Sequence, residues 1–166
     1  FETLNAAGKD FGLTLCGMHM MDTCRIEKGF RHFGHDITCE DHVMEAGLGF
    51  AVKKDKLDFI GRAAVLEKQE SGLNRRMLQF KLTDPEPLLY HNEPILRDGE
   101  LVGYLSSGGY GHTLGGAMGL GYVPCKSETS VDVLASSYEI DVMGTKVSAQ
   151  ASLKPMYDPK SERVKV

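Results

Sequence analysis

The chain has 166 residues, of which 42% are hydrophobic and 25% charged, a balance typical of a globular protein. Its formal net charge of −4 provides no bulk attraction for nucleic acid, and no apolar run reaches the roughly 18 residues of a membrane-spanning helix. The four cysteines form no CxxC pair, which favours free thiols in a reducing compartment over a disulfide framework. We therefore expect neither a nucleic-acid partner nor a membrane partner.

Helical periodicity dominates the first 72 residues. Apolar or small side chains recur at helical spacing over residues 1–11, and Gly12 is a natural stop for that helix. A second helix is predicted from about residue 17 to 28, and a third over residues 61–70, with Gly72 after its end.

Alternating periodicity follows from about residue 74. Apolar and polar residues alternate over 78–82, 138–142 and 147–153, as they do in half-buried strands. Residues 131–135 alternate only in part. Residues 74–154 therefore predict an antiparallel β unit, either a small barrel or a sandwich.

Two short turns are predicted inside this β unit. Asp98-Gly99 stands between two apolar runs and is a strong signal for a two-residue hairpin. Gly144-Thr145 fits a second hairpin turn, with Gly144 at its first central position.

A group of possible metal ligands occupies residues 32–42. His32, His35, Cys39 and His42 supply imidazole and thiolate groups, and four such ligands would form a tetrahedral structural zinc site. Their spacing is not that of a standard zinc finger, and Gly34 argues against a single helical face. We favour ordinary surface or pocket histidines and assign no metal ligand.

Glycine-rich and basic segments give three further candidates. Residues 107–116 form a glycine-rich segment that could cradle phosphate, although a tight loop that lets the barrel close is favoured. Arg75-Arg76 is either an anion site or a pair of solvated residues at the start of a strand. By spacing alone, Asp22 and Arg25 predict a solvated helix face.

A family resemblance emerges from short motifs that occur in a fixed order. The first are R-I-E-K-G-F-R-H at residues 25–32, G-H-D-I at 34–37 and E-A-G-L-G-F at 45–50. They are followed by D-F-I-G-R at 58–62, R-R at 75–76, G-Y-L-S-S-G at 103–108 and M-G-L-G-Y-V-P at 118–124. This series resembles the T-protein (aminomethyltransferase) family of the glycine cleavage system. The R-I-E-K-G-F-R-H form and the ending L-K-P-M-Y-D-P at 153–159 are most similar to modules fused to FAD-dependent sarcosine and dimethylglycine dehydrogenases.

The resemblance implies an α+β fold. Residues 1–73 would be the C-terminal remnant of the folate-binding domain, and residues 74–166 the antiparallel aminomethyltransferase-type β-barrel domain. The family's catalytic aspartate and its other folate motif belong to the half that would precede Phe1, so no catalytic residue is assigned in this chain.

The resemblance also implies a ligand and two binding residues. The family binds tetrahydrofolate and transfers a one-carbon unit to it. Arg25 corresponds to a folate-contact position, and a guanidinium group suits a ligand carboxylate or carbonyl. Phe50 occupies a weaker candidate position beside the pterin. FAD and the N-methyl amine substrate would bind in the missing part of the parent protein.

Three readings of the resemblance stay open at this point. The chain would be part of a sarcosine or dimethylglycine dehydrogenase-like flavoprotein, the tail of a stand-alone T-protein, or a non-catalytic relative that binds or regulates. In each case we expect the isolated chain to be inactive. Its location would be a bacterial cytoplasm or a mitochondrial matrix.

Overall fold

The computed structural model describes residues 1–126, 128–163 and 165. Its first region contains α1 (Glu2–Gly8), which continues as the short 3-10 turn η1 (Lys9–Phe11), then α2 (Met18–Glu27), the 3-10 turn η2 (Gly49–Ala51) and α3 (Arg62–Ser71). The backbone turns left-handed at Gly12 and at Gly29, immediately after the first two helical segments. The three predicted helices are therefore confirmed, with ends that differ by one or two residues.

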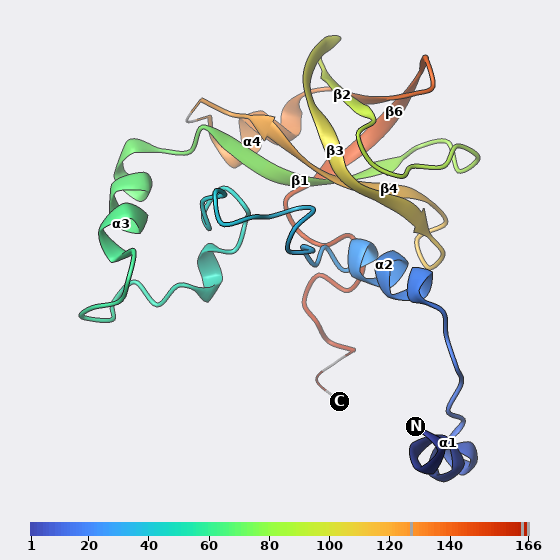
Figure 1. The fold of residues 1–166 in the computed structure, drawn as a ribbon. Helices are drawn as coiled ribbons and strands as arrows, with labels where there is room; N and C mark the ends of the chain where they lie inside the picture. Colours follow the sequence, from blue (N-terminus) through green and yellow to red (C-terminus); the bar gives the residue numbers. More distant parts are fainter. Residues whose placement is uncertain (127, 164, 166) are drawn as a thin grey trace.

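Six strands close into an antiparallel barrel in the spatial order β1-β4-β3-β2-β5-β6 (Figure 1). Phe80 in β1 lies opposite Gly119 of β4 on one side and Ala151 of β6 on the other, which closes the ring. Closure leaves no open sheet edge, so the predicted α+β fold with an antiparallel barrel is confirmed. The strands are β1 (Arg75–Leu82), β2 (Pro94–Arg97), β3 (Glu100–Gly111), β4 (Gly116–Pro124), β5 (Tyr138–Val142) and β6 (Thr145–Ser152).

The two predicted hairpin turns have different outcomes. Asp98 and Gly99, with φ of 53° and 87°, join β2 to β3 as expected. Between β5 and β6, Val142 pairs with Thr145, so the central residues are Met143 and Gly144. Gly144 is therefore second in its turn, and the predicted position was wrong by one residue.

Two other segments also differ from the sequence prediction. Ser130–Ala135 forms α4, not a strand, because Thr129 and Asp132 make a reciprocal capping box at its start. The glycine-rich segment is not a loop over residues 107–111, which belong to β3. A side chain at Gly108 would place its Cβ 2.7 Å from the backbone of Tyr90, so glycine here allows a neighbouring loop to pack on the strand. The predicted loop over residues 107–111 is therefore wrong, and strand residues there do not form the loop on which the phosphate-cradle interpretation depended.

The hydrophobic core lies inside the barrel. Phe80 is completely buried and meets Tyr138 edge to face, with ring centroids 5.4 Å apart. Tyr138 donates its hydroxyl hydrogen bond to the Val133 carbonyl at 2.8 Å, which ties α4 to the barrel. In the described part of the chain, no helix is long and apolar enough to cross a membrane.

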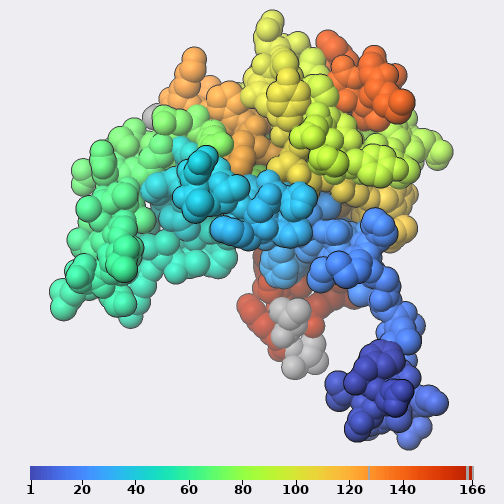
Figure 2. Space-filling view, in the orientation of Figure 1, coloured from blue at the N-terminus to red at the C-terminus, as the bar shows by residue number. Residues whose placement is uncertain are grey.

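The first region sits outside the barrel. α2 lies against β3 and β4, whereas α1 projects away from the rest of the molecule at the end of an extended segment (Figures 1 and 2). The C-terminal segment after β6 returns toward the end of α2. A ligand site between these pieces therefore depends on how α2, the loop that follows it and this C-terminal segment are held together.

Candidate ligand-binding site

Arg25 connects three parts of the chain. Its guanidinium donates to Asp22 in the same helix at 3.1 Å, to Asp36 in the following loop at 2.6 Å and to Ser107 in β3 at 2.9 Å. The Arg25 side chain is only 15% exposed, so its interpretation as part of a solvated helix face is wrong. These contacts fix the loop after α2 against the barrel.

Asp36 is the buried centre of that connection. Besides Arg25, its carboxylate accepts hydrogen bonds from the backbone N–H of His32 at 2.8 Å and from the Ser106 hydroxyl at 2.5 Å. A buried carboxylate requires such compensation, because loss of its water is costly. Asp36 lies in the G-H-D-I motif, whose pattern indicates the family but not a buried carboxylate.

The C-terminal end of α2 is held by the barrel. The Gln79 side chain donates to the carbonyls of Ile26 and Glu27 at 2.6 and 3.0 Å, which satisfies two groups that a helix end leaves without partners. The buried Glu27 carboxylate accepts from the backbone N–H groups of Thr113 and Leu114 at 2.7 and 2.9 Å. The helix end is therefore fixed in position and in orientation.

The C-terminal segment docks on the same helix end. Lys28 Nζ donates to the backbone carbonyl of Asp158 and, at 3.1 Å, to its carboxylate. Met156 N–H donates to the Gln79 side chain at 2.7 Å, and Tyr157 N–H donates to the Glu27 carbonyl at 3.3 Å. These bonds place residues 153–161 beside the loop after α2.

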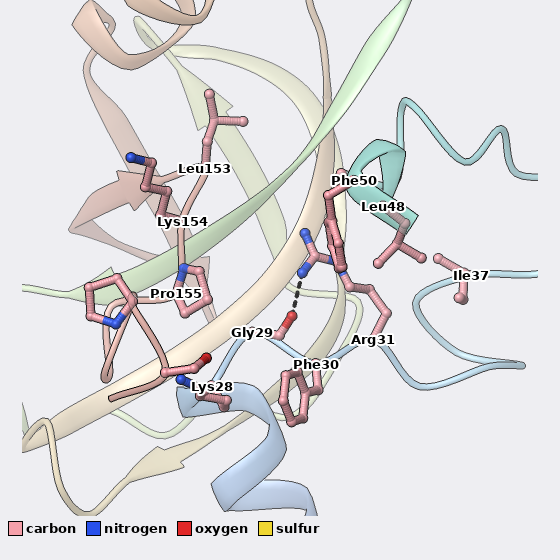
Figure 3. A pocket seen from close by; sticks show the side chains of 13 residues that line it. Lys28, Gly29, Phe30, Arg31, Ile37, Leu48, Phe50, Leu153, Lys154 and Pro155 are labelled. Atoms are coloured by element: carbon pink, nitrogen blue, oxygen red, sulfur yellow. Dashed lines mark hydrogen bonds between the residues drawn. The ribbon is translucent and has the colours of Figure 1, made fainter. Parts of the chain in front are cut away.

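A pocket of about 550 Å³ lies between this segment and the loop. Figure 3 shows Arg31, Leu48 and Phe50 on one side and Leu153, Lys154 and Pro155 on the other. The volume suits a small molecule with one or two ring systems. Phe50 is 86% exposed, so its ring is available to a ligand.

The chain matches known domains over most of its length. Residues 75–158 match the glycine cleavage T-protein C-terminal barrel domain, and residues 1–56 match the GCVT N-terminal domain. The chain belongs to the glycine cleavage T-protein family. The chain is 39% identical to 4-methylaminobutanoate oxidase (formaldehyde-forming) of Paenarthrobacter nicotinovorans and 35% identical to mitochondrial sarcosine dehydrogenase of Homo sapiens, and each alignment covers 99% of this chain.

This T-protein family chain spans about a fifth of those two relatives, 19% of the first and 18% of the second. It also resembles the solved structure of glycine cleavage system aminomethyltransferase T from Bartonella henselae, with 25% identity and a TM-score of 0.71. That match covers 83% of this chain and 38% of the solved one.

The family's two predicted binding residues lie in different places. Phe50 lines the 550 Å³ pocket, whereas Arg25 lines a separate hollow together with His32 and His35. The structure does not bring Arg25 and Phe50 into one cavity. The direct folate contact of either residue stays a prediction.

The other candidates from the sequence are the possible anion site at Arg75 and the possible metal ligands among the histidines and cysteines. Arg75 pairs with Asp41 at 2.6 Å and Glu45 at 3.1 Å, so its charge is compensated within the chain although 41% of its side chain is exposed. The rings of His32 and His35 lie 4.6 Å apart. Among the described residues, no group of three or more histidine, cysteine, aspartate or glutamate side chains could hold a metal ion.

One pocket residue was missed by the sequence analysis. Arg31 donates from Nε to the Ala46 carbonyl at 3.0 Å and from Nη1 to the Gly29 carbonyl. It stands inside the R-I-E-K-G-F-R-H motif, but nothing in the sequence distinguishes it from a solvated arginine. Only the fold shows that its side chain lines the same pocket as Phe50.

Proposed function

We propose that this chain is the C-terminal part of a tetrahydrofolate-dependent one-carbon transfer module in a sarcosine or dimethylglycine dehydrogenase-like flavoprotein. The observation that carries the proposal is the alignment of 99% of the chain with two relatives named for the oxidation of N-methyl amines. In such a parent protein, FAD bound outside this chain would oxidise the N-methyl group of the amine. Tetrahydrofolate would then take up the one-carbon unit as 5,10-methylenetetrahydrofolate.

The residues of this chain fit the folate part of that activity. The 550 Å³ pocket combines the exposed Phe50 ring with apolar walls and the donors of Arg31, a composition that suits an aromatic ligand with polar substituents. We propose that Phe50 contacts the folate and that Arg25 acts on the site from a distance. Three of the Arg25 donors are already engaged with Asp22, Asp36 and Ser107, which supports a positioning role through the loop after α2.

The proposal also assigns two domains to the chain. Residues 1–73 would belong to the folate-binding domain and residues 74–166 to the barrel domain. The isolated chain would be inactive, since the catalytic aspartate of the family would belong to the rest of the parent. The parent would work in a bacterial cytoplasm or a mitochondrial matrix.

The first experiment measures two activities of the full-length protein. One is amine oxidation, and the other is folate coupling, which is the transfer of the one-carbon unit to tetrahydrofolate. We expect a purified protein with flavin absorbance that oxidises an N-methyl amine and, with tetrahydrofolate present, converts the one-carbon unit to 5,10-methylenetetrahydrofolate. Phe50→Ala and Arg25→Ala should each reduce folate coupling and leave amine oxidation unchanged. A protein of full length without flavin and without folate binding would contradict the proposal, and a flavin-free protein that still transfers a one-carbon unit would point to a stand-alone aminomethyltransferase.

A further inference from the structure

Arg31 is a partly buried cation without a carboxylate partner in the described ranges 1–126, 128–163 and 165. The two protein groups that accept its hydrogen bonds are neutral carbonyls, those of Ala46 and Gly29. Its second terminal nitrogen, Nη2, has no hydrogen-bond partner within the same ranges, and the side chain lines the pocket (Figure 3). A guanidinium group stripped of water is stabilised most strongly by an anion.

Two other partly buried arginines show what a purely structural guanidinium looks like in this chain. Arg97 donates to the Glu128 carboxylate at 2.8 Å, and that bond outweighs burial and raises the Arg97 pKa. Burial lowers the pKa of Arg75, but its bonds to Glu45 and Asp41 reverse the effect and raise it. Burial also lowers the pKa of Arg31, and there the more distant charges of Asp36 and Tyr122 do not compensate.

The backbone makes room for the Arg31 guanidinium. A Cβ atom at Gly47 would lie 2.7 Å from Arg31 Nη2, and Gly47 has a φ of 71°, so any other residue there would meet both a clash and backbone strain. The charged residues that line the pocket are Lys28, Arg31 and Lys154, with no aspartate or glutamate among the lining residues that the structure describes. Because Lys28 is paired with Asp158, the uncompensated positive charge comes from Arg31 and from Lys154 at the exposed rim.

We propose that Arg31 recognises a carboxylate of the ligand in this pocket, and that for tetrahydrofolate this carboxylate belongs to the glutamyl group. The inference rests on the proposed function for the identity of the ligand. The Phe50 ring lines the same pocket and would flank the aromatic part of that ligand. Arg31 is thus a direct ligand contact that the sequence alone did not indicate.

The test compares 5-formyltetrahydrofolate with its glutamyl dimethyl ester, in which two methyl groups replace the two carboxylate charges, by calorimetric titration of the full-length protein. The wild-type protein should prefer the diacid, because charge-assisted hydrogen bonds to a guanidinium correspond to about 10- to 100-fold in Kd. Arg31→Gln should lose that preference by weakening diacid binding alone. Arg31→Lys should retain part of it, since an ammonium group keeps the charge but not the planar pair of donors.

Arg97→Gln is the matched control, because it removes another partly buried arginine, whose carboxylate partner Glu128 lies between β4 and α4, away from the pocket. It should lower the melting temperature and keep the ligand preference. Binding of the dimethyl ester by Arg31→Gln shows that the variant pocket is folded. An unchanged preference in Arg31→Gln, or equal affinity of the wild type for both ligands, would overturn this inference alone. Failure of the wild type to bind either ligand would overturn the proposed function as well.

Discussion

The barrel and the first 72 residues differ in what holds them together. The barrel encloses a continuous apolar core, with Leu78, Phe80, Ile95 and Ile140 inaccessible to solvent. In the first 72 residues the buried hydrophobic side chains that the structure describes are Ile26, Ala46 and Val65, and large apolar residues from Phe1 to Ile60 are exposed. Burial of apolar area is the main driving force of folding, so the barrel is the source of this chain's stability.

The junction between the two regions is polar where the barrel is apolar. Each buried polar or charged side chain contacts a group across this junction or on the C-terminal segment that closes it: Glu27, Lys28, Asp36, Glu45, Gln79 and Ser107. Hydrogen bonds are directional, whereas apolar burial is not. The junction therefore orients the pocket, and the barrel supplies the stability on which that orientation depends.

The largest loss of stability is expected from a substitution in the barrel core. Phe80→Ala removes a side chain that is completely buried and should lower the free energy of unfolding by about 3–5 kcal/mol. Urea denaturation followed by circular dichroism measures the loss. Phe11→Ala is the control in the first region, and at 90% exposure it should change stability by less than about 0.5 kcal/mol. Equal losses in the two variants would contradict the assignment of stability to the barrel.

The next largest loss of stability is expected from a substitution at the junction between the first region and the barrel. Asp36→Asn leaves the Arg25 guanidinium without its buried carboxylate and should cost about 2–3 kcal/mol. Hydrogen exchange should accelerate in α2 and in residues 30–37, while β1 and β4 keep their protection. Asp22→Asn removes the more exposed partner of the same arginine and should have little effect. Uniform acceleration across the barrel would show that the junction and the core unfold as one unit.

A third, smaller effect concerns the helix that the sequence did not predict. Thr129→Ala removes the capping box of α4 and should cost about 1 kcal/mol, because one backbone donor at the helix start loses its acceptor. Chemical denaturation measures the change. Ser130→Ala, one residue along, leaves the cap intact and serves as the control. If both variants behave alike, the cap does not contribute to barrel stability.

The smallest effect is a pH dependence at Glu45. Burial by itself raises the pKa of Glu45, but hydrogen bonds from Lys68, the Asn74 N–H and Arg75 outweigh it, so the folded pKa is below the ordinary 4.5. The corresponding stability is present above pH 4.5 and disappears as the pH falls through the folded pKa. Because Arg75 is 41% exposed and solvent screens it, we expect less than about 1 kcal/mol.

A matched pair of melting curves tests this linkage. The melting temperature of the wild type should fall more steeply between pH 6 and pH 3 than that of Glu45→Gln, which cannot lose the charge. Asp98, Asp132 and Asp158 also have lowered pKa values and contribute to both curves, so the difference between the two proteins is the relevant quantity. Parallel curves would remove Glu45 from the acid-sensitive part of the junction.

Local signals in the sequence predicted those elements that local chemistry controls. The glycines after the first two helices, the Asp98-Gly99 hairpin and the alternation in β1, β5 and β6 are confirmed because backbone conformation and side-chain period act within a few residues. The same reasoning failed over residues 107–111, which read as a loop because of their glycines. Gly108 instead allows the loop near Tyr90 to pack against β3, a contact between segments that are distant in sequence.

By itself the sequence determined the periods of helix and strand, the antiparallel β unit and, through the order of its motifs, the family. The tertiary structure alone decided that the barrel closes. It also decided that the Arg25 guanidinium donates hydrogen bonds to Asp22, Asp36 and Ser107. It also decided that Arg31 shares a pocket with Phe50.

Arg25 and Arg31 are six positions apart in one motif and carry the same guanidinium group. What separates them is the set of acceptors that folding brings to each guanidinium group: Arg25 meets the Asp36 carboxylate and the Ser107 hydroxyl, whereas Arg31 meets the neutral carbonyl of Ala46.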